Sequence, residues 1–397
     1  ENYLKLLHGR NAIMKIIADA DILDVSKSLS DLGELELISG REIQARHLAD
    51  ADALIVRSIT QVDESLLKNS KIRFVGTATS GSNHIDTEYL SRNGIEFVDA
   101  KGSNANAVVD YFFSALAFAV VHKSLDIDAC TVGIVGGGKV GGLLAKKLKL
   151  LSIPFKICDP PLDQLQCASE EETKTDYYSL GEVMACEVVT LHVPLSHSGE
   201  FPTASLISNE QLGLLPKNGL MVNACRGGVV DEQDLIQFLK NREDVSTVFD
   251  VWENEPSPNK ELLELVDIAT PHIAGYSREA KAAATEMMRK AIYAYLGKEE
   301  KSLEENPEQN KFNLELPNLD NDNVWNSVLK AMPVMEISSN FKSAASSIDG
   351  DKVFDKIRAE LRSRREFGAI HLIGKSQSEL SPAKVGFLGA LGFSFQG

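Results

Sequence analysis

Cysteine, clustered positive charge and long apolar runs are all scarce in this 397-residue sequence, and each scarcity excludes a class of protein. The five cysteines are scattered and form no Cys-X-X-Cys pair, which argues against a disulfide-rich secreted domain and against a zinc module. We therefore expect free thiols in a reducing cytoplasm and no bound metal. The longest apolar run, around Tyr111 to Val121, is well short of the ~20 residues that span a bilayer, so we expect no membrane partner.

Charge is unbalanced towards the acidic side. The chain has 57 Asp and Glu against 41 Lys and Arg, a net charge of −16, and no basic block. A nucleic-acid partner is therefore disfavoured, and a few local cationic groups must hold any anionic substrate. The length predicts two or three domains of ~150 residues each. We take Met14 as the natural start of the protein and residues 1–13 as a leader outside the fold.

A glycine-rich turn follows the apolar run Val132–Val135. Its glycines have GxGxxG spacing, and apolar residues recur at helical spacing from Val140 onward. Gly136 suits the tight turn, Gly138 lets the backbone approach a pyrophosphate, and Gly141 lets the helix lie close to the strand. The helix N-terminus, with Lys139 and Val140, would then face the phosphates of a dinucleotide.

A second apolar run, Ile153–Cys158, ends in Asp159, where a dinucleotide fold carries the acid that binds the adenosine ribose. Its carboxylate would repel a 2′-phosphate, and prolines follow it rather than an arginine. These features favour NAD over NADP. The alternative is an ordinary strand-to-helix turn followed by a surface aspartate.

Short apolar runs alternate with helical stretches along most of the chain, which predicts an α/β fold with parallel sheets. Ala107–His122 is apolar nearly all round and predicts a buried helix joining two domains. The predicted strands before this helix are Lys15–Ala18, Ala53–Val56, Ile72–Val75 and Ile95–Val98. After the helix, the dinucleotide fold continues beyond its first two strands with predicted strands at Glu187–Val193, Gly219–Ala224, Thr247–Val251 and Val266–Thr270.

Three polar clusters follow the last three predicted strands, where ligands of open parallel sheets bind. They contain Arg226, Glu255 and His272. A histidine can take a hydroxyl proton while hydride leaves the same carbon, an adjacent carboxylate would orient the ring, and an arginine can hold a substrate carboxylate. The alternatives are a structural histidine and a surface arginine.

These motifs together resemble the D-isomer-specific 2-hydroxyacid dehydrogenases over about residues 14–300. The motifs are GxGxxG followed by Asp159, Ala-Cys-Arg-Gly at 224–227, Asp-Val-Trp-x-x-Glu-Pro at 250–256 and Thr-Pro-His-Ile-Ala-Gly at 270–275. More narrowly, Val56–Thr60, Phe74–Thr79, Pro271–Tyr276 and the tail resemble one branch of the family that has its own C-terminal dimerisation domain. The tail motifs are Phe354–Arg358, Arg364–Glu366 and Leu391–Phe393.

The resemblance implies a role for each matching residue. The catalytic residues would be Arg226, Glu255 and His272, with His272 as the acid/base. The substrate contacts would be Ser58, Thr79 and Tyr276. The cofactor contacts would be Gly136, Gly138, Lys139, Val140, Gly141, Asp159, Val193, Ala224, Cys225, Arg226, Asp250 and Gly275.

The implied fold is a doubly wound Rossmann NAD-binding domain (108–273), a discontinuous flavodoxin-like substrate-binding domain (14–107 and 274–300) and a small α+β dimerisation domain (302–397). Residues 299–323 predict an acidic linker. In the tail we expect a helix over 353–365, a strand over 369–373 and a last helix from Pro382 to about Gly392. A homodimer formed through this tail is expected.

The implied activity is NAD-dependent oxidation of 4-phospho-D-erythronate to 2-oxo-3-hydroxy-4-phosphobutanoate in vitamin B6 biosynthesis. One alternative is another dehydrogenase of the family, such as one acting on 3-phosphoglycerate. A second alternative is a non-catalytic NAD-sensing scaffold, because a co-repressor family shares the fold. The loop between Asp159 and His192, with its acidic run 170–172, is longer than usual for the family.

Overall fold

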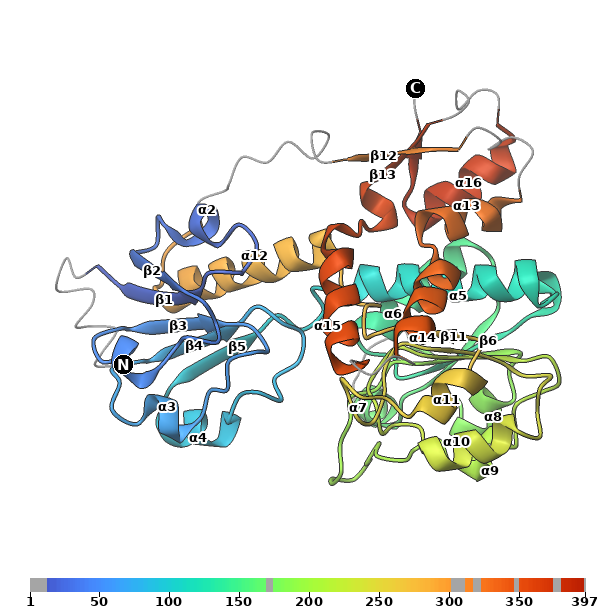
Figure 1. The fold of residues 1–397 in the computed structure, drawn as a ribbon, viewed down its shortest axis with the longest axis horizontal. Coiled ribbons are helices and arrows are strands. Elements are labelled where there is room, and N and C mark those ends of the chain that lie inside the picture. Colours follow the sequence, from blue (N-terminus) through green and yellow to red (C-terminus); the bar gives the residue numbers. More distant parts are fainter. Residues whose placement is uncertain are drawn as a thin grey trace. The chain divides into compact units, whose positions relative to one another are not determined.

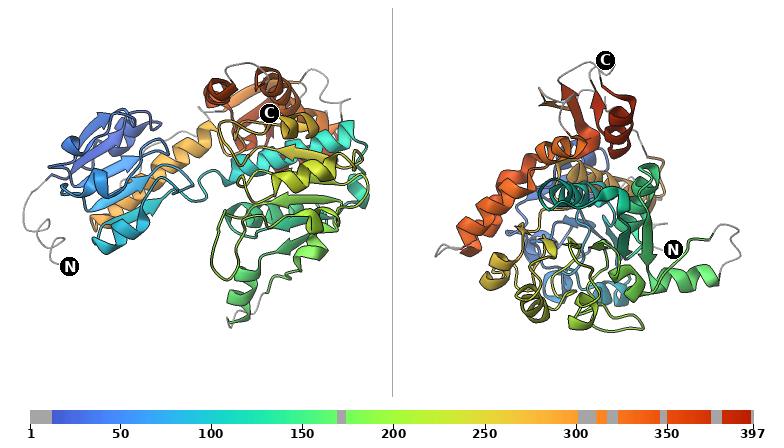
Figure 2. Two further views of the ribbon diagram at one scale, coloured as in Figure 1. Left: turned by 60° about the horizontal axis from the view of Figure 1, so that its bottom comes forward. Right: turned by 90° about the vertical axis from the view of Figure 1, so that its right-hand side faces the viewer.

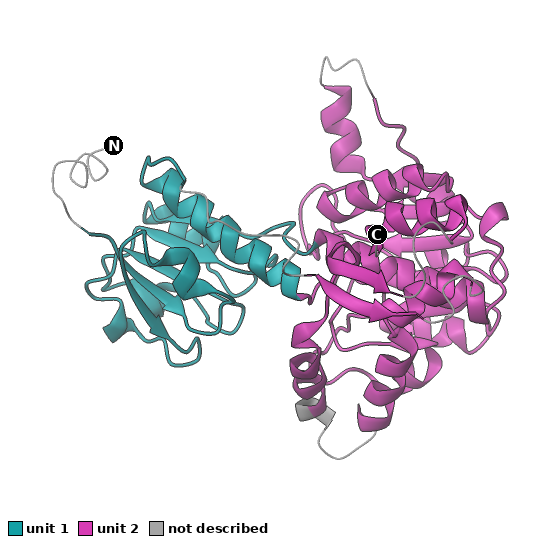
Figure 3. Ribbon diagram, turned by 90° about the horizontal axis from the view of Figure 1, so that it is seen from above, with its two compact units in different colours: residues 1–104, 278–307 teal, residues 105–277, 308–397 magenta. Residues whose placement is uncertain are grey.

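The computed structural model describes residues 13–168, 174–300, 311–316, 323–345, 350–373 and 380–395. The proposed leader (apart from Ile13), the acidic run 170–172 and most of the proposed linker lie outside these residues. The chain divides into two compact units, residues 1–104 with 278–307 and residues 105–277 with 308–397 (Figure 3). These divisions lie within four residues of the predicted boundaries at 107 and 274.

The first unit is a parallel sheet covered by helices on both faces (Figure 1). Its strand order, β2-β1-β3-β4-β5, is the flavodoxin-like order. Ile16 and Phe74 pack on one face against α12, whereas Ile17 and Val75 pack on the other. The strands are β1 Lys15–Asp19, β2 Glu34–Ile38, β3 Ala53–Val56, β4 Phe74–Thr77 and β5 Glu96–Asp99, and the helices are α2 Val25–Leu29, η1 Ala45–His47, α3 Glu64–Leu67, α4 Thr87–Arg92 and α12 Arg278–Tyr295.

The second unit contains a six-stranded parallel sheet in the order β11-β10-β9-β8-β6-β7. Beyond β7, a single parallel bridge joins Ile157 to Tyr177, at the place of the third strand of a dinucleotide-binding sheet. The strands are β6 Val132–Val135, β7 Phe155–Cys158, β8 Val188–Leu191, β9 Leu220–Asn223, β10 Ser246–Phe249 and β11 Ile268–Ala269. The 3₁₀ helix η2 Ile127–Ala129 precedes β6. The helices between the strands are α6 Lys139–Leu150, α7 Pro160–Cys167, α8 Leu180–Met184, α9 Asn209–Leu212, α10 Glu232–Leu239 and α11 Lys260–Leu265.

Helix α5, Ala105–His122, is the buried helix that the sequence predicts (Figure 2). Of the described helices, it alone is long and apolar enough to cross a membrane, with a mean hydropathy of 1.4. However, 78% of it is buried inside the protein, against the sheet helix α6 and the C-terminal helix α13. Burial within the fold therefore accounts for its apolar composition.

The described C-terminal residues share one core with the second unit. Trp325, Val328 and Phe367 belong to the same apolar cluster as strand residues Val132 and Val222. The sequence predicts a separate domain at 302–397, whereas the structure groups 308–397 with the second unit because of this common core. The elements are β12 Phe312–Glu315, α13 Val324–Ala331, α14 Val334–Ala345, α15 Gly350–Glu360, η4 Leu361–Ser363, η5 Phe367–Ala369, β13 Ile370–Ile373, α16 Pro382–Leu391 and β14 Ser394–Phe395.

Some predictions for this region need correction. Strand β12 lies inside the predicted linker, and it pairs in parallel with β13, as β14 also does. The helix predicted at 353–365 begins earlier, at Gly350, and becomes a 3₁₀ turn after Glu360. The last helix is confirmed; it ends at Leu391 and is capped by Gly392, whose φ of 116° favours glycine.

Candidate active site

The glycine turn between β6 and α6 has the predicted shape. Gly136 has φ 97°, and a side chain there would meet the His192 carbonyl group at 2.8 Å. A Cβ at Gly141 would lie 1.9 Å from the Gly136 oxygen, so only glycine lets α6 approach the turn. A Cβ at Gly138 would meet nothing within 4 Å, which leaves open space in front of the helix N-terminus at Lys139. These features fit a bound dinucleotide.

Asp159 has a local structural role in addition to its predicted one. Its Oδ2 accepts a hydrogen bond from the Gly137 N–H at 2.7 Å, and its Oδ1 caps α7 by accepting from the Leu162 N–H at 3.0 Å. The carboxylate thereby joins the end of β7 to the glycine turn. Each oxygen retains a further lone pair with which it could accept a hydrogen bond from a ribose hydroxyl.

The loop after β8 lies against the glycine turn. A Cβ at Gly136 would meet Val193 Cγ1 at 2.9 Å, so Val193 borders the turn. Its contact with NAD remains a prediction. Burial lowers the pKa of His192 to about 3, and its Nε2 lies 3.0 Å from the Thr190 hydroxyl. His192 is thus a neutral structural histidine in this loop.

The loop after β9 presents Arg226. The Arg226 guanidinium is half-buried and donates to the Cys225 carbonyl oxygen at 2.7 Å. Burial raises the pKa of Cys225 to about 11, which makes a reactive thiolate there unfavourable. A Cβ at Gly227 would lie 1.9 Å from the Trp252 oxygen, so this glycine lets the loops after β9 and β10 approach each other.

The structure brings His272 and Glu255, the predicted acid/base pair, together. The Nδ1 of His272 lies 2.7 Å from Oε2 of Glu255, and the two side chains keep 34% and 26% of their surface exposed. The other Glu255 oxygen, Oε1, accepts from the Trp252 N–H at 3.1 Å. His272 itself has φ 53°, a left-handed conformation that is strained for a residue other than glycine. The surrounding loop must therefore hold it in place.

Asp250 holds the backbone of the histidine loop. Its buried carboxylate accepts from the N–H groups of Ile273 and Ala274 at 2.8 and 2.7 Å, and its carbonyl accepts from the His272 N–H at 2.7 Å. Burial raises the pKa of Asp250, although these hydrogen bonds and His272 act in the opposite direction. The observed role of this side chain is to shape the loop, and its predicted contact with NAD remains a prediction.

Asp250 is held by a series of hydrogen bonds that the sequence did not suggest. The Thr270 hydroxyl donates to Asp250 Oδ1 at 2.6 Å, and the Tyr111 hydroxyl of α5 lies 2.7 Å from Thr270. The Trp252 ring N–H donates to the Thr270 carbonyl at 3.0 Å. The available signal in the sequence was Tyr111, one of the few polar residues in the largely apolar α5.

The remaining predicted residues are placed as follows. Gly275 and Tyr276 follow His272 in the same loop and are half-buried. Ser58 and Thr79 follow β3 and β4 of the first unit; Ser58 is exposed, and the Thr79 hydroxyl donates to the Gly81 carbonyl at 3.0 Å. Ala224 begins the loop that carries Arg226.

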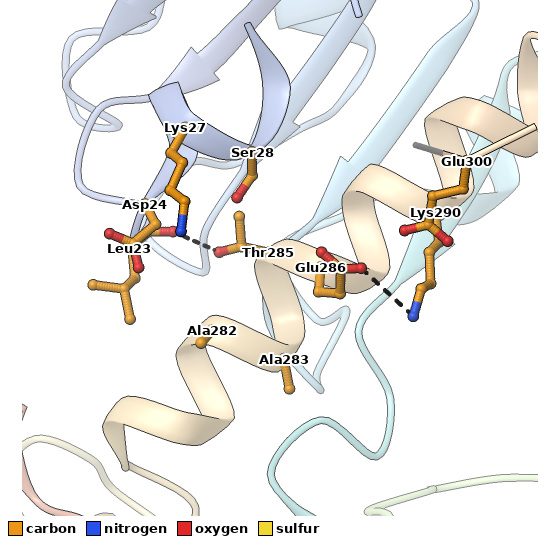
Figure 4. Close-up of a pocket in the computed structure, with 10 residues that line it drawn as sticks. All are labelled: Leu23, Asp24, Lys27, Ser28, Ala282, Ala283, Thr285, Glu286, Lys290 and Glu300. Carbon is orange, nitrogen blue, oxygen red and sulfur yellow. Dashed lines mark hydrogen bonds and ion pairs between the residues drawn. The ribbon is translucent and has the colours of Figure 1, made fainter. Parts of the chain in front are cut away.

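A charged pocket of about 490 Å³ lies elsewhere in the first unit, between α2 and α12 (Figure 4). Its lining includes Lys27, Glu286 and Lys290, and Glu286 forms an ion pair with Lys290 at 3.5 Å. None of the predicted site residues lines it. Within the described parts of the chain, no group of three His, Cys, Asp or Glu is placed to hold a metal ion.

Comparison with known proteins decides the family. Residues 117–274 match the model of the D-isomer specific 2-hydroxyacid dehydrogenase NAD binding domain. Erythronate-4-phosphate dehydrogenase of Shewanella amazonensis is 37% identical over 402 residues, which cover 96% of this chain and 99% of that protein. The enzyme of the same name from Escherichia coli O7:K1 is 39% identical over 380 residues, covering 94% and 98%. The chain belongs to the erythronate-4-phosphate dehydrogenases.

Solved structures place these dehydrogenases within the wider 2-hydroxyacid family. The NAD+-bound 3-phosphoglycerate dehydrogenase of Entamoeba histolytica has a TM-score of 0.59 and 25% identity, covering 72% of this chain and 96% of that one. The D-lactate dehydrogenase of Aquifex aeolicus, complexed with NAD and lactic acid, shares the fold, with a TM-score of 0.57, 20% identity and 71% and 95% coverage. The prediction of an NAD-binding domain is confirmed by the family model that matches residues 117–274.

Proposed function

We propose that this protein oxidises the 2-hydroxyl of 4-phospho-D-erythronate to give 2-oxo-3-hydroxy-4-phosphobutanoate, using NAD, in the synthesis of pyridoxine 5′-phosphate. The sequence similarity to erythronate-4-phosphate dehydrogenases extends over nearly the whole chain. The observation that carries the chemistry is the His272–Glu255 pair, with Nδ1 and Oε2 2.7 Å apart.

His272 acts as the base in this proposal. Because Glu255 engages Nδ1, the imidazole has Nε2 available to accept the hydroxyl proton of the substrate. The C2–H bond breaks and its electron pair leaves as hydride, while the O–H electrons form the new C=O bond. NAD, when bound, accepts that hydride. Glu255 stabilises the imidazolium that results.

Arg226 binds the substrate carboxylate in this proposal. A guanidinium can hold a carboxylate through two parallel hydrogen bonds, and this fixes which face of C2 presents its hydrogen. We assign the remaining substrate contacts to Ser58, Thr79 and Tyr276. The glycine turn and Asp159 would hold the pyrophosphate and ribose of NAD, for which the open space at Gly138 is the supporting observation.

Homodimer formation through 302–397 and a cytoplasmic location are further parts of the proposal. The described tail exposes two large apolar side chains, Phe312 at 48% and Met335 at 39%, and we assign both to the contact surface between the subunits. Sedimentation of the full chain should give a dimer, and Phe312→Asp with Met335→Asp should weaken it. A monomeric wild-type protein would rule the assembly out.

Formation of NADH on different substrates tests the activity. We expect kcat/KM for 4-phospho-D-erythronate to exceed that for 3-phospho-D-glycerate by about 10- to 200-fold, because the two differ by one carbon unit in a fitted site. A preference for 3-phospho-D-glycerate would support the alternative of a 3-phosphoglycerate dehydrogenase. Absence of turnover with every 2-hydroxy acid, together with NAD binding, would support the scaffold.

A further inference from the structure

The loop that carries His272 is held from two sides. On one side, Asp250 accepts from the N–H groups of Ile273 and Ala274. On the other side, the guanidinium of Arg364 donates from Nη2 to the Ala274 carbonyl at 2.7 Å and from Nε to the Tyr276 carbonyl at 3.0 Å. The two carbonyls bracket Gly275. One arginine thus fixes the orientation of the peptide groups that follow Ala274 and Tyr276, two and four residues after the histidine.

Arg364 is itself firmly placed by its neighbours. Glu366 Oε1 accepts from the Ser277 hydroxyl at 2.7 Å, and the Phe367 N–H donates to the buried Asp110 at 2.7 Å. Glu366 and Phe367 are buried. These two contacts anchor residues 366 and 367, two and three positions after Arg364, so the guanidinium has little freedom to leave the carbonyls.

Arg364 and Tyr276 each make further contacts. Arg364 Nη2 lies 3.4 Å from the Ala107 carbonyl of α5, and Nη1 lies 3.0 Å from Met332 Sδ. The guanidinium of Arg358, on α15, lies 5.5 Å from the centroid of the Tyr276 ring. Both the backbone and the side chain of Tyr276 are therefore restrained by arginines of the C-terminal region.

We propose that Arg364 is a positioning residue for the dehydrogenation. It holds the 272–276 loop in the strained conformation that directs His272 and Tyr276, without contacting substrate or cofactor itself. This role differs from a phosphate contact across a dimer and from a surface salt bridge, the two roles that adjacent arginines in an acidic chain would otherwise suggest. The inference rests on the proposed function, because it assigns the loop a catalytic task.

Substitution of Arg364 tests the proposal. Arg364→Met keeps most of the side-chain volume and removes every donor, whereas Arg364→Lys keeps one charged donor group. We expect Arg364→Met to lower kcat by about 10- to 100-fold and to raise the KM for substrate, since misplacement of a catalytic group has effects of this size. Arg364→Lys should recover part of kcat.

Chemical rescue separates positioning from general stability. Guanidinium ion added to Arg364→Ala should restore part of kcat, because it can occupy the vacated place and donate to the same carbonyls. Arg242 is the matched control, since it also donates to two backbone carbonyls, of Leu215 and Pro216, but before β9 and away from the loop. Arg242→Ala should lose stability without a change in kcat and should gain no activity from guanidinium.

Hydrogen exchange gives a readout that does not depend on turnover. Amides of residues 273–277 should exchange faster in Arg364→Met and Arg364→Lys than in the wild type, with no such change in Arg242→Ala. If both Arg364 variants keep wild-type kcat, KM and loop exchange, the positioning role is wrong. Failure of the wild-type enzyme to oxidise the substrate would instead contradict the proposed function, and the exchange result would still stand.

Discussion

At the scale of single residues, the site depends on hydrogen bonds that leave little freedom to the reacting groups. Glu255 accepts from Trp252 through one oxygen and binds His272 through the other. The left-handed conformation of His272 is maintained by Asp250, which binds three successive N–H groups of the loop through its carbonyl and carboxylate oxygens. Strain of this kind costs on the order of 1–3 kcal/mol, which the buried hydrogen bonds offset.

Asp159 gives the first prediction. It caps α7 and also carries the negative charge that opposes a 2′-phosphate, so its two roles must be separated. Asp159→Ser keeps an N-cap oxygen but removes the charge. We expect this variant to weaken NAD binding and to relax discrimination against NADP, measured as the ratio of kcat/KM for the two cofactors.

Asp159→Ala is the control for the capping role. It should relax the same ratio and in addition lower the free energy of unfolding by about 1 kcal/mol relative to Asp159→Ser. An unchanged cofactor ratio in both variants would remove Asp159 from the cofactor site.

The sequence could predict the chemistry of these residues but not the direction of every side chain. Glu255 and His272 were matched through family motifs, and the structure brings them together. The same motifs predicted Asp250 to be a cofactor contact, yet its carboxylate is buried among N–H groups of the loop. Arg364 was recognised only as part of a tail motif. Its target, two carbonyls almost ninety positions earlier, depends on tertiary packing that no local pattern encodes.

At the scale of elements, Asp110 joins α5 to the C-terminal segment. Its Oδ2 accepts from the Phe367 N–H, and Lys147 of α6 lies 3.4 Å from Oδ1 and donates to the Leu391 carbonyl at 2.7 Å. Burial raises the pKa of Asp110 to about 6, although Lys147 and Arg364 partly oppose this. Ionisation of this carboxyl group is thus less favourable in the folded than in the unfolded chain.

This pKa predicts a pH dependence of stability. The unfolded carboxyl loses its proton near pH 3.8 and the folded one near pH 6. Between these values the folded state binds more protons, so the contribution of Asp110 to stability falls as pH rises. The Asp110→Asn side chain does not ionise, so its contribution to stability does not fall as pH rises. Its side-chain oxygen still accepts a hydrogen bond from the Phe367 N–H. Relative to wild type, the variant should gain about 2 kcal/mol between pH 4 and 6, measured by urea unfolding.

Asp31→Asn is the control, because the contribution of Asp31 to stability changes with pH in the opposite direction. Arg289 lowers the pKa of Asp31 to about 2, so the stability that Asp31 contributes is present above pH 3.8 and is lost as pH falls towards 2. A difference curve for Asp110→Asn that is flat between pH 4 and 6 would contradict the assignment.

Elements were predictable where burial gives a clear pattern. The apolar runs identified β1, β3, β6 and β8, which are buried along most of their length. Strand β2 was missed because Glu34 and Glu36 alternate with leucines in a largely exposed edge strand. Strand β12 was missed for a similar reason, since it lies in an acidic stretch and exposes Phe312.

At the scale of the whole molecule, the C-terminal region completes the second unit. The Ser338 hydroxyl of α14 accepts from the Ala269 N–H of the edge strand β11 at 2.9 Å, and Lys342 donates to the Val266 carbonyl. Phe341 packs against Trp252 and Phe354, with ring centroids 6.4 and 5.8 Å apart. The sequence predicts the tail as a separate domain, whereas the structure shows a core shared with the second unit.

Phe341→Ala tests this shared core. Phe341 is fully buried against the residue that positions Glu255, so we expect a loss of about 3–5 kcal/mol in the free energy of unfolding and a lower kcat. Phe387→Ala is the control, because Phe387 packs against Trp325 and not against Trp252. It should lower stability with kcat retained. Retention of full stability and kcat in Phe341→Ala would contradict the supporting role of the tail.

The account as a whole depends on His272 as the group that accepts the substrate proton. The most direct test is the rate of NADH formation on rapid mixing of His272→Asn with NAD and 4-phospho-D-erythronate, with NAD affinity measured in the same preparation. We predict a rate lower by about 10²- to 10⁴-fold with NAD affinity nearly unchanged, because only the proton acceptor is lost. Hydride transfer at the wild-type rate in this variant would contradict the account.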